Sequence, residues 1–185
     1  MGYRSNEECI SLPVSVLTGT VGSPTFEIAE RAASALRAQG NKFRVVFAST
    51  LGVLTYVGWE YAREPTLAYQ PCRQFYMASI DVTCKETAPY ATRGFDKRQL
   101  YAYLSYGYGP YDYFATYETE TTLAKKLNMY IEDVSDGWAL FEVDRDSWRG
   151  CGYKKDDDYP RLSIVQEQAR HRRTVNESAL KPDNS

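Results

Sequence analysis

The sequence predicts an α/β chain, because its amino-terminal third has the pattern of a strand, a helix and a second strand. Residues 9–18 and 43–57 are runs of apolar and β-branched residues, which are typical of buried strands. Residues 23–40 have apolar side chains at helical spacing, with Ser23 and a following proline as start signals and Gly40 as a stop signal. This order is that of a parallel β/α unit.

Residues 58–113 lose this regularity. Aromatic, proline and threonine residues mix there without a helical or strand period, and Cys72 and Cys84 lie within the stretch. We expect an irregular aromatic insertion closed by a Cys72–Cys84 disulfide, whose loop closure is worth about 2 to 3 kcal/mol in the chain-entropy model. The sequence does not decide whether Cys9 and Cys151 also pair.

Regular structure is predicted to return near the end of the insertion. Alternating tyrosines between Tyr101 and Tyr108 fit either a strand or an aromatic loop. From Thr116 onward, acidic residues come early and lysines late, which is the polarity that a helix dipole favours. We expect a helix there, with an inner face formed by Leu123, Leu127 and Ile131.

The carboxyl-terminal part predicts one more strand, one more helix and a tail. Residues 138–144 are a compact apolar run that predicts a strand, and residues 161–170 have a helical pattern. Residues 169–185 are polar, and we expect a disordered tail there. The tail contains an N-x-S sequon, which makes Asn176 a candidate glycosylation site.

Charge balance and cysteine usage exclude several classes of function. With 22 basic and 24 acidic residues, the net charge of -2 gives no overall field for nucleic acid. No run of about 18 apolar residues is present to cross a membrane. The 4 cysteines form no C-x-x-C pair and have only His171 beside them as a metal-binding residue type, so we expect no metal site. No glycine-rich phosphate or dinucleotide loop is present either, and we expect no cofactor.

Disulfides are the better explanation of the cysteines, and they indicate an oxidising compartment. We therefore expect an extracellular, secreted protein. The first residues of the sequence do not have the apolar core of a signal peptide, which conflicts with that expectation.

Two stretches of the carboxyl-terminal half carry motifs. Residues 138–152, WALFEVDRDSWRGCG, join an apolar strand to an acidic segment, and residues 115–126 contain Y-E-x-x-x-T-x-x-x-K. They resemble the last barrel strand with its D-x-D-D-F-x-G-x-C segment, and the preceding Y-D-x-x-x-S-x-x-x-K stretch, of family 18 glycoside hydrolases, the chitinases and chitinase-like proteins. The short insertion is most similar to the divergent tick-like proteins of arachnids. The matching positions around the acidic segment are Asp144, Asp146, Trp148, Gly150, Cys151, Tyr159 and Pro160.

The resemblance implies a partial barrel. Residues 1–168 would be the carboxyl-terminal portion, about strands six to eight, of a (β/α)8 TIM barrel, with residues 58–113 as a short cysteine-bounded insertion. A closed barrel of this kind needs eight strands and about 250 residues. We therefore expect the isolated chain to aggregate, to form oligomers or to stay molten, because its lumen-facing side chains meet water. The side chains expected to be exposed in this way are Val14, Val46, Val53 and Phe141.

The family's catalytic motif, D-x-x-D-x-D-x-E, is absent from the sequence. Its final glutamate supplies the proton in family members, whose substrate-assisted chemistry departs from the usual two-carboxylate scheme. The nearest approach here is Asp133 and Asp136, and the next required acids fall on Trp138 and Leu140. We expect no catalytic residue in this chain and no hydrolysis by it.

Four residues are candidates for contact with sugar. Phe141 falls where the resemblance places the tryptophan floor of the sugar site, and it either offers a smaller platform or fills the barrel core. Glu142 either lines the lumen or caps the strand end. Tyr56 and Trp59 end the second apolar run, at the rim where barrel sites lie, and either contact sugar or pack there. Trp138 is expected on the face opposite Phe141, toward the outer helices.

The resemblance implies a full-length protein that binds or hydrolyses chitin or related N-acetylglucosamine polymers. The alternative is a secreted, non-catalytic interaction module that uses the aromatic insertion against a protein partner. An upstream D-x-x-D-x-D-x-E motif would favour the hydrolase, and an upstream sequence without its final glutamate would favour the binding protein.

Overall fold

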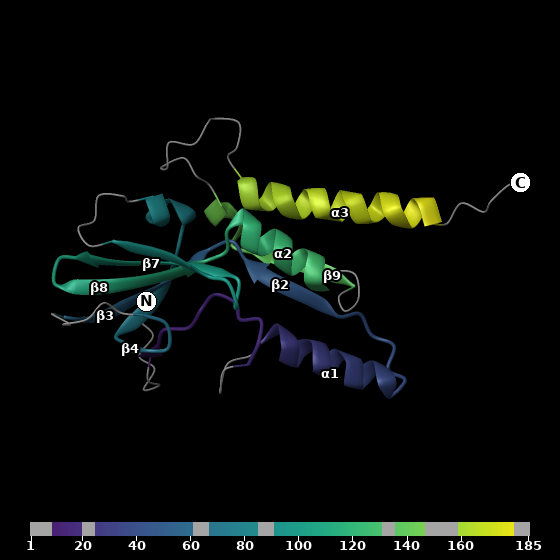
Figure 1. The fold of residues 1–185 in the computed structure, drawn as a ribbon, viewed down its shortest axis with the longest axis horizontal. Helices are drawn as coiled ribbons and strands as arrows, with labels where there is room; N and C mark the ends of the chain where they lie inside the picture. Colours follow the sequence, from purple (N-terminus) through teal and green to yellow (C-terminus); the bar gives the residue numbers. More distant parts are fainter. Residues whose placement is uncertain are drawn as a thin grey trace, which may run out of the picture.

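A computed structural model describes residues 9–19, 25–60, 67–84, 91–130, 136–146 and 159–179. Its elements form two regions, a parallel strand pair with three helices and an antiparallel sheet, which lie to the right and left in Figure 1. The strands are β1 (Cys9–Ile10), β2 (Val46–Thr50), β3 (Val53–Glu60), β4 (Pro71–Cys72), β5 (Gln74–Ala78), β6 (Thr92–Asp96), β7 (Tyr101–Tyr108), β8 (Tyr111–Tyr117) and β9 (Gly137–Phe141). The helices are α1 (Phe26–Ala38), α2 (Glu120–Tyr130) and α3 (Pro160–Ala179), with short 3-10 turns η1 (Ile80–Cys84) and η2 (Val143–Asp146).

The parallel pair of β2 and β9 is the part of the chain that follows the predicted β/α pattern. Val46 lies opposite Gly137 and Thr50 lies opposite Phe141. Alternate side chains point to opposite faces, so Phe47 and Trp138 share the face toward the helices. There the ring of Trp138 stacks on Phe26 of α1 at 5.7 Å, and it also packs against apolar residues of α2. The predicted orientation of Trp138 is therefore confirmed.

The antiparallel sheet corrects the expectation of an irregular insertion at residues 58–113. Its strand order is β5-β3-β8-β7-β6, and it is inserted between β2 and α2. The alternating tyrosines belong to β7, which resolves the choice between strand and loop in favour of a strand. The predicted single strand 43–57 is also wrong, because the apolar run divides at Leu51 and Gly52 into β2 of one sheet and β3 of the other.

The centre of the antiparallel sheet is covered on both faces, whereas Trp59, Phe75 and Tyr108 of the same sheet are exposed. On one face, Val53, Leu104 and Ala115 pack with Ile80 and Val82 of η1. The other face carries Tyr56 and Phe114 against the amino-terminal segment and the β4 strand. Val53 is 0% exposed, so the expectation that it faces water is wrong; its partner is η1 rather than a barrel lumen.

Residues 9–18 are not the barrel strand that was predicted. Only Cys9–Ile10 is a strand, and it pairs antiparallel with β4 instead of parallel with β2. The rest of the segment crosses the antiparallel sheet, where the Val14 amide donates to Thr116 Oγ1 at 2.5 Å and the Leu17 amide donates to Gln99 Oε1 at 3.0 Å. Apolar, β-branched composition is common to both arrangements, and it did not distinguish a barrel strand from a segment that covers a sheet.

The disulfide pairing also differs from the prediction. Cys9 is bonded to Cys72, with their Cα atoms 4.9 Å apart, so Cys72 is not bonded to Cys84. The β1–β4 register places Cys9 directly opposite Cys72, which explains the pairing. Cys84 is itself disulfide-bonded. Cys9 is therefore not paired with Cys151, which itself lies outside the described residues.

The helices keep their predicted order but begin and end at other residues. α1 is capped by Thr25, whose side chain accepts from the Ile28 amide, and the predicted start at Ser23 lies outside the described residues. α2 begins at Glu120 rather than Thr116, because β8 continues to Tyr117 and the side chain of Thr119 caps the helix.

α3 continues to Ala179, so residues 169–179 are helical and the expected disordered tail is wrong over that range. Asn176 lies within α3. In the part of the chain that the structure describes, no helix is long and apolar enough to cross a membrane.

Candidate functional site

The candidate site lies where β2 and β9 end, at one edge of the parallel pair. The Leu51 amide donates to the Phe141 carbonyl at 2.9 Å, which fixes the last residue of β9 to the end of β2. Because neighbouring parallel strands end at the same edge of a sheet, side chains from both strands meet there. Phe141 is 61% exposed, so it does not fill a core among the described residues.

The face of the parallel pair that carries Phe141 is apolar and open. Phe141 shares this face with Val46, Ala48 and Ala139, according to the register and the alternation of the strands. Val46 is 53% exposed. The exposure expected for Val46 and Phe141 is therefore confirmed, and an apolar strip leads along β2 and β9 to the aromatic ring at their end.

Glu142, directly after Phe141, adopts an uncommon backbone conformation. Its φ of 54° lies in the left-handed region, which is rare for a residue with a side chain. The Glu142 carboxylate forms an ion pair with Nε of Arg145, and the Arg145 amide donates to the Glu142 carbonyl at 3.0 Å. The strand end and the following turn are thus held in one arrangement.

Tyr56 and Trp59, the other two sugar-binding candidates, belong to the antiparallel sheet. Tyr56 is 4% exposed and packs with Cys72 and Phe114. Burial raises the pKa of its hydroxyl, which forms a hydrogen bond with the Leu12 backbone. Of the two roles that the sequence left open for Tyr56, the structure therefore shows packing, and the side chain is not open to sugar. Trp59 is exposed on β3, in the other sheet from Phe141 and Glu142.

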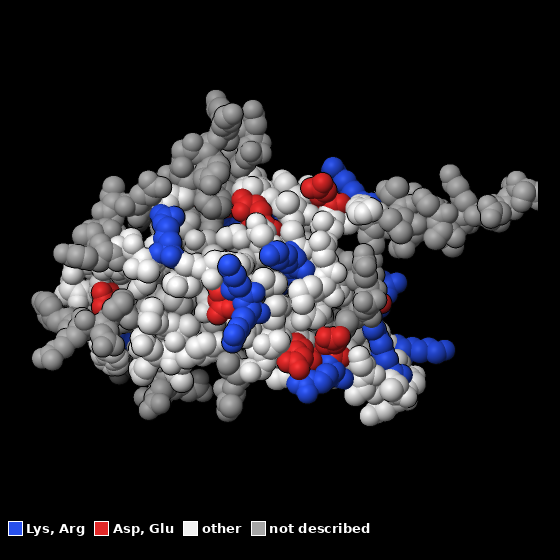
Figure 2. Space-filling model, in the orientation of Figure 1, with Lys and Arg blue, Asp and Glu red and all other residues white. Residues whose placement is uncertain are grey.

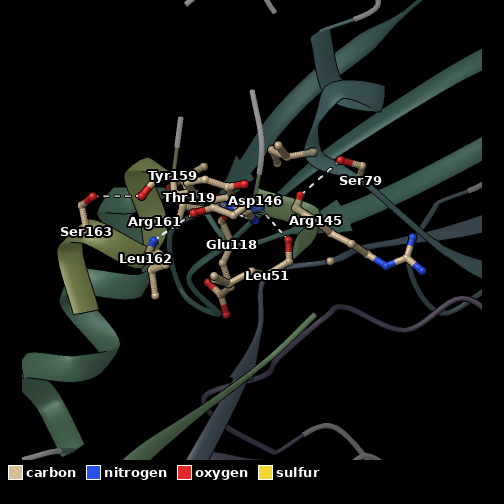
Figure 3. A network of polar contacts seen from close by, with 12 residues as sticks. Leu51, Ser79, Glu118, Thr119, Arg145, Asp146, Tyr159, Arg161, Leu162 and Ser163 are labelled. Carbon is tan, nitrogen blue, oxygen red and sulfur yellow. Dashed lines mark hydrogen bonds and ion pairs between the residues drawn. The ribbon is translucent and has the colours of Figure 1, made fainter. Parts of the chain in front are cut away.

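A buried polar network supports the candidate site from behind (Figure 3). Nε of Arg161 pairs with Oδ1 of Asp146 at 2.5 Å, and both residues are 0% exposed. The same guanidinium donates to the Leu51 carbonyl at 2.6 Å and to the Glu118 carbonyl at 3.1 Å. Asp146 also accepts from the Leu162 amide at 2.9 Å, at the start of α3. The backbone of Leu51 is thus bound at its carbonyl by Arg161 and at its amide by the Phe141 carbonyl.

A second buried network closes the junction of β8 and α2. Nζ of Lys126 lies 2.6 Å from Oε1 of Glu118, and Ser15 forms hydrogen bonds with both groups. Thr122 donates to the other Glu118 oxygen at 2.5 Å. Burial lowers the pKa of the Lys126 ammonium, and the Glu118 carboxylate opposes that shift. Because Glu118, Thr122 and Lys126 are all buried, we assign this network to the fold and not to chemistry on a ligand.

The sequence motifs anticipated these networks only in part. Glu118, Thr122 and Lys126 are the positions that matched the Y-D-x-x-x-S-x-x-x-K stretch, and they meet in the structure. The helix-dipole interpretation of Lys126 did not predict that its side chain is buried. Arg161 was not singled out, and no local signal in the sequence distinguishes it from the other arginines of the last helix.

No group of residues in the described ranges is arranged to hold a metal ion. At the candidate site, the carboxylates of Glu142 and Asp146 are each paired with an arginine. On the face shown in Figure 2, basic and acidic side chains are interspersed, without a broad patch of one sign. The end of β9 offers the exposed ring of Phe141 followed by the charged Glu142, which suits a ligand that has both an apolar face and polar groups.

Comparison with solved structures shows that the fold is a known one. A Trichuris suis chitinase described as immunomodulatory matches with a TM-score of 0.63 and 16% identity, over 86% of this chain and 46% of its own. The chain has the fold of part of a chitinase domain. A Group IV chitinase of Ostrinia furnacalis matches with a TM-score of 0.60 and 12% identity, over 87% of this chain and 46% of the enzyme.

Human YKL-39, described as a pseudo-chitinase with retained chitooligosaccharide binding, matches with a TM-score of 0.59 and 14% identity, over 87% of this chain and 46% of its own. The chain thus spans less than half the length of these chitinase and chitinase-like structures, and their low identity shows the fold alone. No protein-family model and no curated protein sequence matches the chain.

Proposed function

We propose that this chain is part of a chitinase-like protein that binds N-acetylglucosamine oligomers, and that Phe141 is the platform on which a sugar ring stacks. The observation that carries the proposal is the exposure of Phe141 at the end of β9, in a fold that matches part of chitinase domains. Glu142, the next residue, carries a half-exposed carboxylate that could meet the polar groups of the ligand. The binding of chitooligosaccharides by YKL-39, a structure of the same fold, supports the ligand class.

We propose further that the chain does not hydrolyse this ligand. The sequence has no D-x-x-D-x-D-x-E motif, and the carboxylates of Glu142 and Asp146, which follow β9, are each held in an ion pair with an arginine. The expected result is no turnover of a fluorogenic chitooligosaccharide above the blank. Turnover that Glu142→Gln removes would contradict this part of the proposal.

The open face of β2 and β9 supports a larger barrel around the site. Val46 and Phe141 leave apolar area in water that a further β/α unit would bury, at about 25 cal/mol per Å². The neighbouring structures are about twice as long as the matched region. We propose that the full-length protein completes this face with additional β/α units. The Cys9–Cys72 disulfide supports a secreted location, and the tick-like subgroup remains a prediction from the sequence.

Binding of a tetramer of N-acetylglucosamine, followed by titration calorimetry, tests the platform. We expect binding by the chain, little binding of cellotetraose, which has no acetamido group, and loss of binding in Phe141→Ala. The matched control is Phe75→Ala on β5, because Phe75 is 65% exposed and belongs to the other sheet. Equal loss in both variants, or no loss in Phe141→Ala, would contradict the proposed platform.

A further inference from the structure

Arg145 connects the candidate sugar site to the antiparallel sheet. Its Nε pairs with the Glu142 carboxylate, and its Nη1 donates to the Met77 carbonyl of β5 at 2.9 Å. Ser79, just after β5, donates from its hydroxyl to the Arg145 carbonyl at 3.3 Å. Figure 3 shows the Arg145 side chain directed away from the Asp146 network. One arginine therefore bridges two elements that belong to different sheets.

The Arg145 side chain contacts Glu142, the residue directly after Phe141. Glu142 has a φ of 54°, a conformation that side chains disfavour and that persists only where neighbouring contacts hold it. The contacts made by Arg145 are of this kind, since they engage both the Glu142 carboxylate and the Glu142 carbonyl. Release of Glu142 toward an ordinary conformation would turn the chain at the end of β9. The Phe141 carbonyl belongs to the peptide unit that precedes Glu142, so its hydrogen bond with the Leu51 amide would be disturbed first.

We propose that Arg145 is a positioning residue, which holds the Phe141 platform in its ligand-ready direction and couples it to the antiparallel sheet through Met77. The inference rests on the proposed function of Phe141. Arg145 stands at the variable position between the two acids of the acidic segment, so this role belongs to this chain and does not follow from the family resemblance. The geometry at Glu142 and Met77 is what assigns it.

The test compares two half-exposed ion pairs of similar exposure. The first pair is Arg145 with Glu142, at 34% and 39%, and the control is Arg37 with Asp136, at 35% and 42%. In the full chain, Arg145→Gln is expected to weaken binding of the N-acetylglucosamine tetramer about 5- to 10-fold, within the usual range of coupling between sites. Arg37→Gln is expected to leave it unchanged. Arg145→Lys should fall between, because one ammonium reaches Glu142 or Met77 but not both.

A second readout reports on the platform without any ligand. The Leu51 amide donates to the Phe141 carbonyl, so its hydrogen exchange should become faster in Arg145→Gln and stay unchanged in Arg37→Gln. If the parent chain does not bind the tetramer, the proposed function fails, and the Leu51 exchange alone decides the role of Arg145. Unchanged hydrogen exchange of the Leu51 amide in Arg145→Gln overturns the inference. If the parent chain binds the tetramer, equal tetramer affinity in Arg145→Gln overturns it as well.

Discussion

The two regions of the molecule bury their apolar side chains to different extents. The antiparallel sheet is covered by η1 on one face and by the amino-terminal segment on the other, and a disulfide fixes that segment to β4. The parallel pair of β2 and β9 is covered by helices on one face only. Val53 and Val46, seven residues apart in one apolar run, show the result, since they are 0% and 53% exposed.

The antiparallel sheet is thus packed against other segments of the chain, whereas the parallel pair has one apolar face exposed to solvent. A covered sheet gains stability from both faces, whereas an open apolar face is a binding surface or a cause of aggregation. The candidate sugar site lies at the end of the open face, and its supporting contacts come from the covered region through Arg145 and Arg161. The stable part of the molecule thus positions a site that belongs to the open part.

The largest expected effect comes from breaking the buried pair that joins the two regions. Asp146→Asn leaves the Arg161 guanidinium without its charge partner at 0% exposure, which should cost about 3 to 5 kcal/mol of unfolding free energy. Because Arg161 also binds the carbonyls of Leu51 and Glu118, both regions should lose stability together. Urea unfolding followed by fluorescence and by far-ultraviolet circular dichroism measures this loss.

The surface pair of Arg37 and Asp136 is the control, and Arg37→Gln should cost no more than about 1 kcal/mol. Two separate transitions in Asp146→Asn, with the antiparallel sheet unaffected, would show that the regions are independent and that Arg161 does not join them.

The sequence predicted the open region better than the covered one. Strand and helix periods identified α1, α2 and the strand that begins near Trp138, because each has one apolar side facing a single layer. The orientation of Trp138 opposite Phe141 followed from the alternation of a strand. For these elements, local pattern and final environment agree.

The covered region could not be predicted in the same way, because its partners are distant in sequence. Residues 9–18 have the composition of a buried strand, yet what they cover is a sheet about 50 to 100 residues away. The Cys9–Cys72 pairing follows from the β1–β4 register, which no local spacing contains. The burial of Tyr56 could not be predicted for the same reason, since its neighbours Cys72 and Phe114 come from other strands.

An intermediate effect is expected from the two valines of the divided apolar run. Val53→Ala removes two methyl groups from the core beneath η1 and should cost about 1 to 3 kcal/mol. Val46→Ala should change the unfolding free energy by less than about 0.5 kcal/mol, because the side chain already faces water. It should instead lower the binding of a hydrophobic dye, which Val53→Ala should not lower. Equal costs in urea unfolding would contradict the contrast between the regions.

An alkaline loss of stability should also originate in the antiparallel sheet. Burial raises the pKa of Tyr101 to about 12, and the nearby Asp96 carboxylate adds to the shift. An unfolded tyrosine ionises near pH 10, so between pH 10 and 12 the folded chain binds the extra proton. The free energy of unfolding should therefore fall as pH rises through this window, by up to about 1.4 kcal/mol per pH unit for one proton.

Lys126 gives a change of the opposite sign at lower pH. Its pKa is lowered in the folded chain, so its unfolded form binds more protons until its ordinary pKa near 10.5 is passed, and stability rises with pH up to that point. Urea unfolding at intervals from pH 9 to 12 separates the two contributions. Tyr101→Phe should reduce the fall above pH 10, whereas Tyr108→Phe, at a side chain that is 75% exposed, should leave it unchanged. If Tyr101→Phe and the parent chain lost stability equally over this range, the fall would come from other groups, such as the hydroxyls of Tyr76 and Tyr106 in the same sheet, whose pKa values burial also raises, and its assignment to Tyr101 would be wrong.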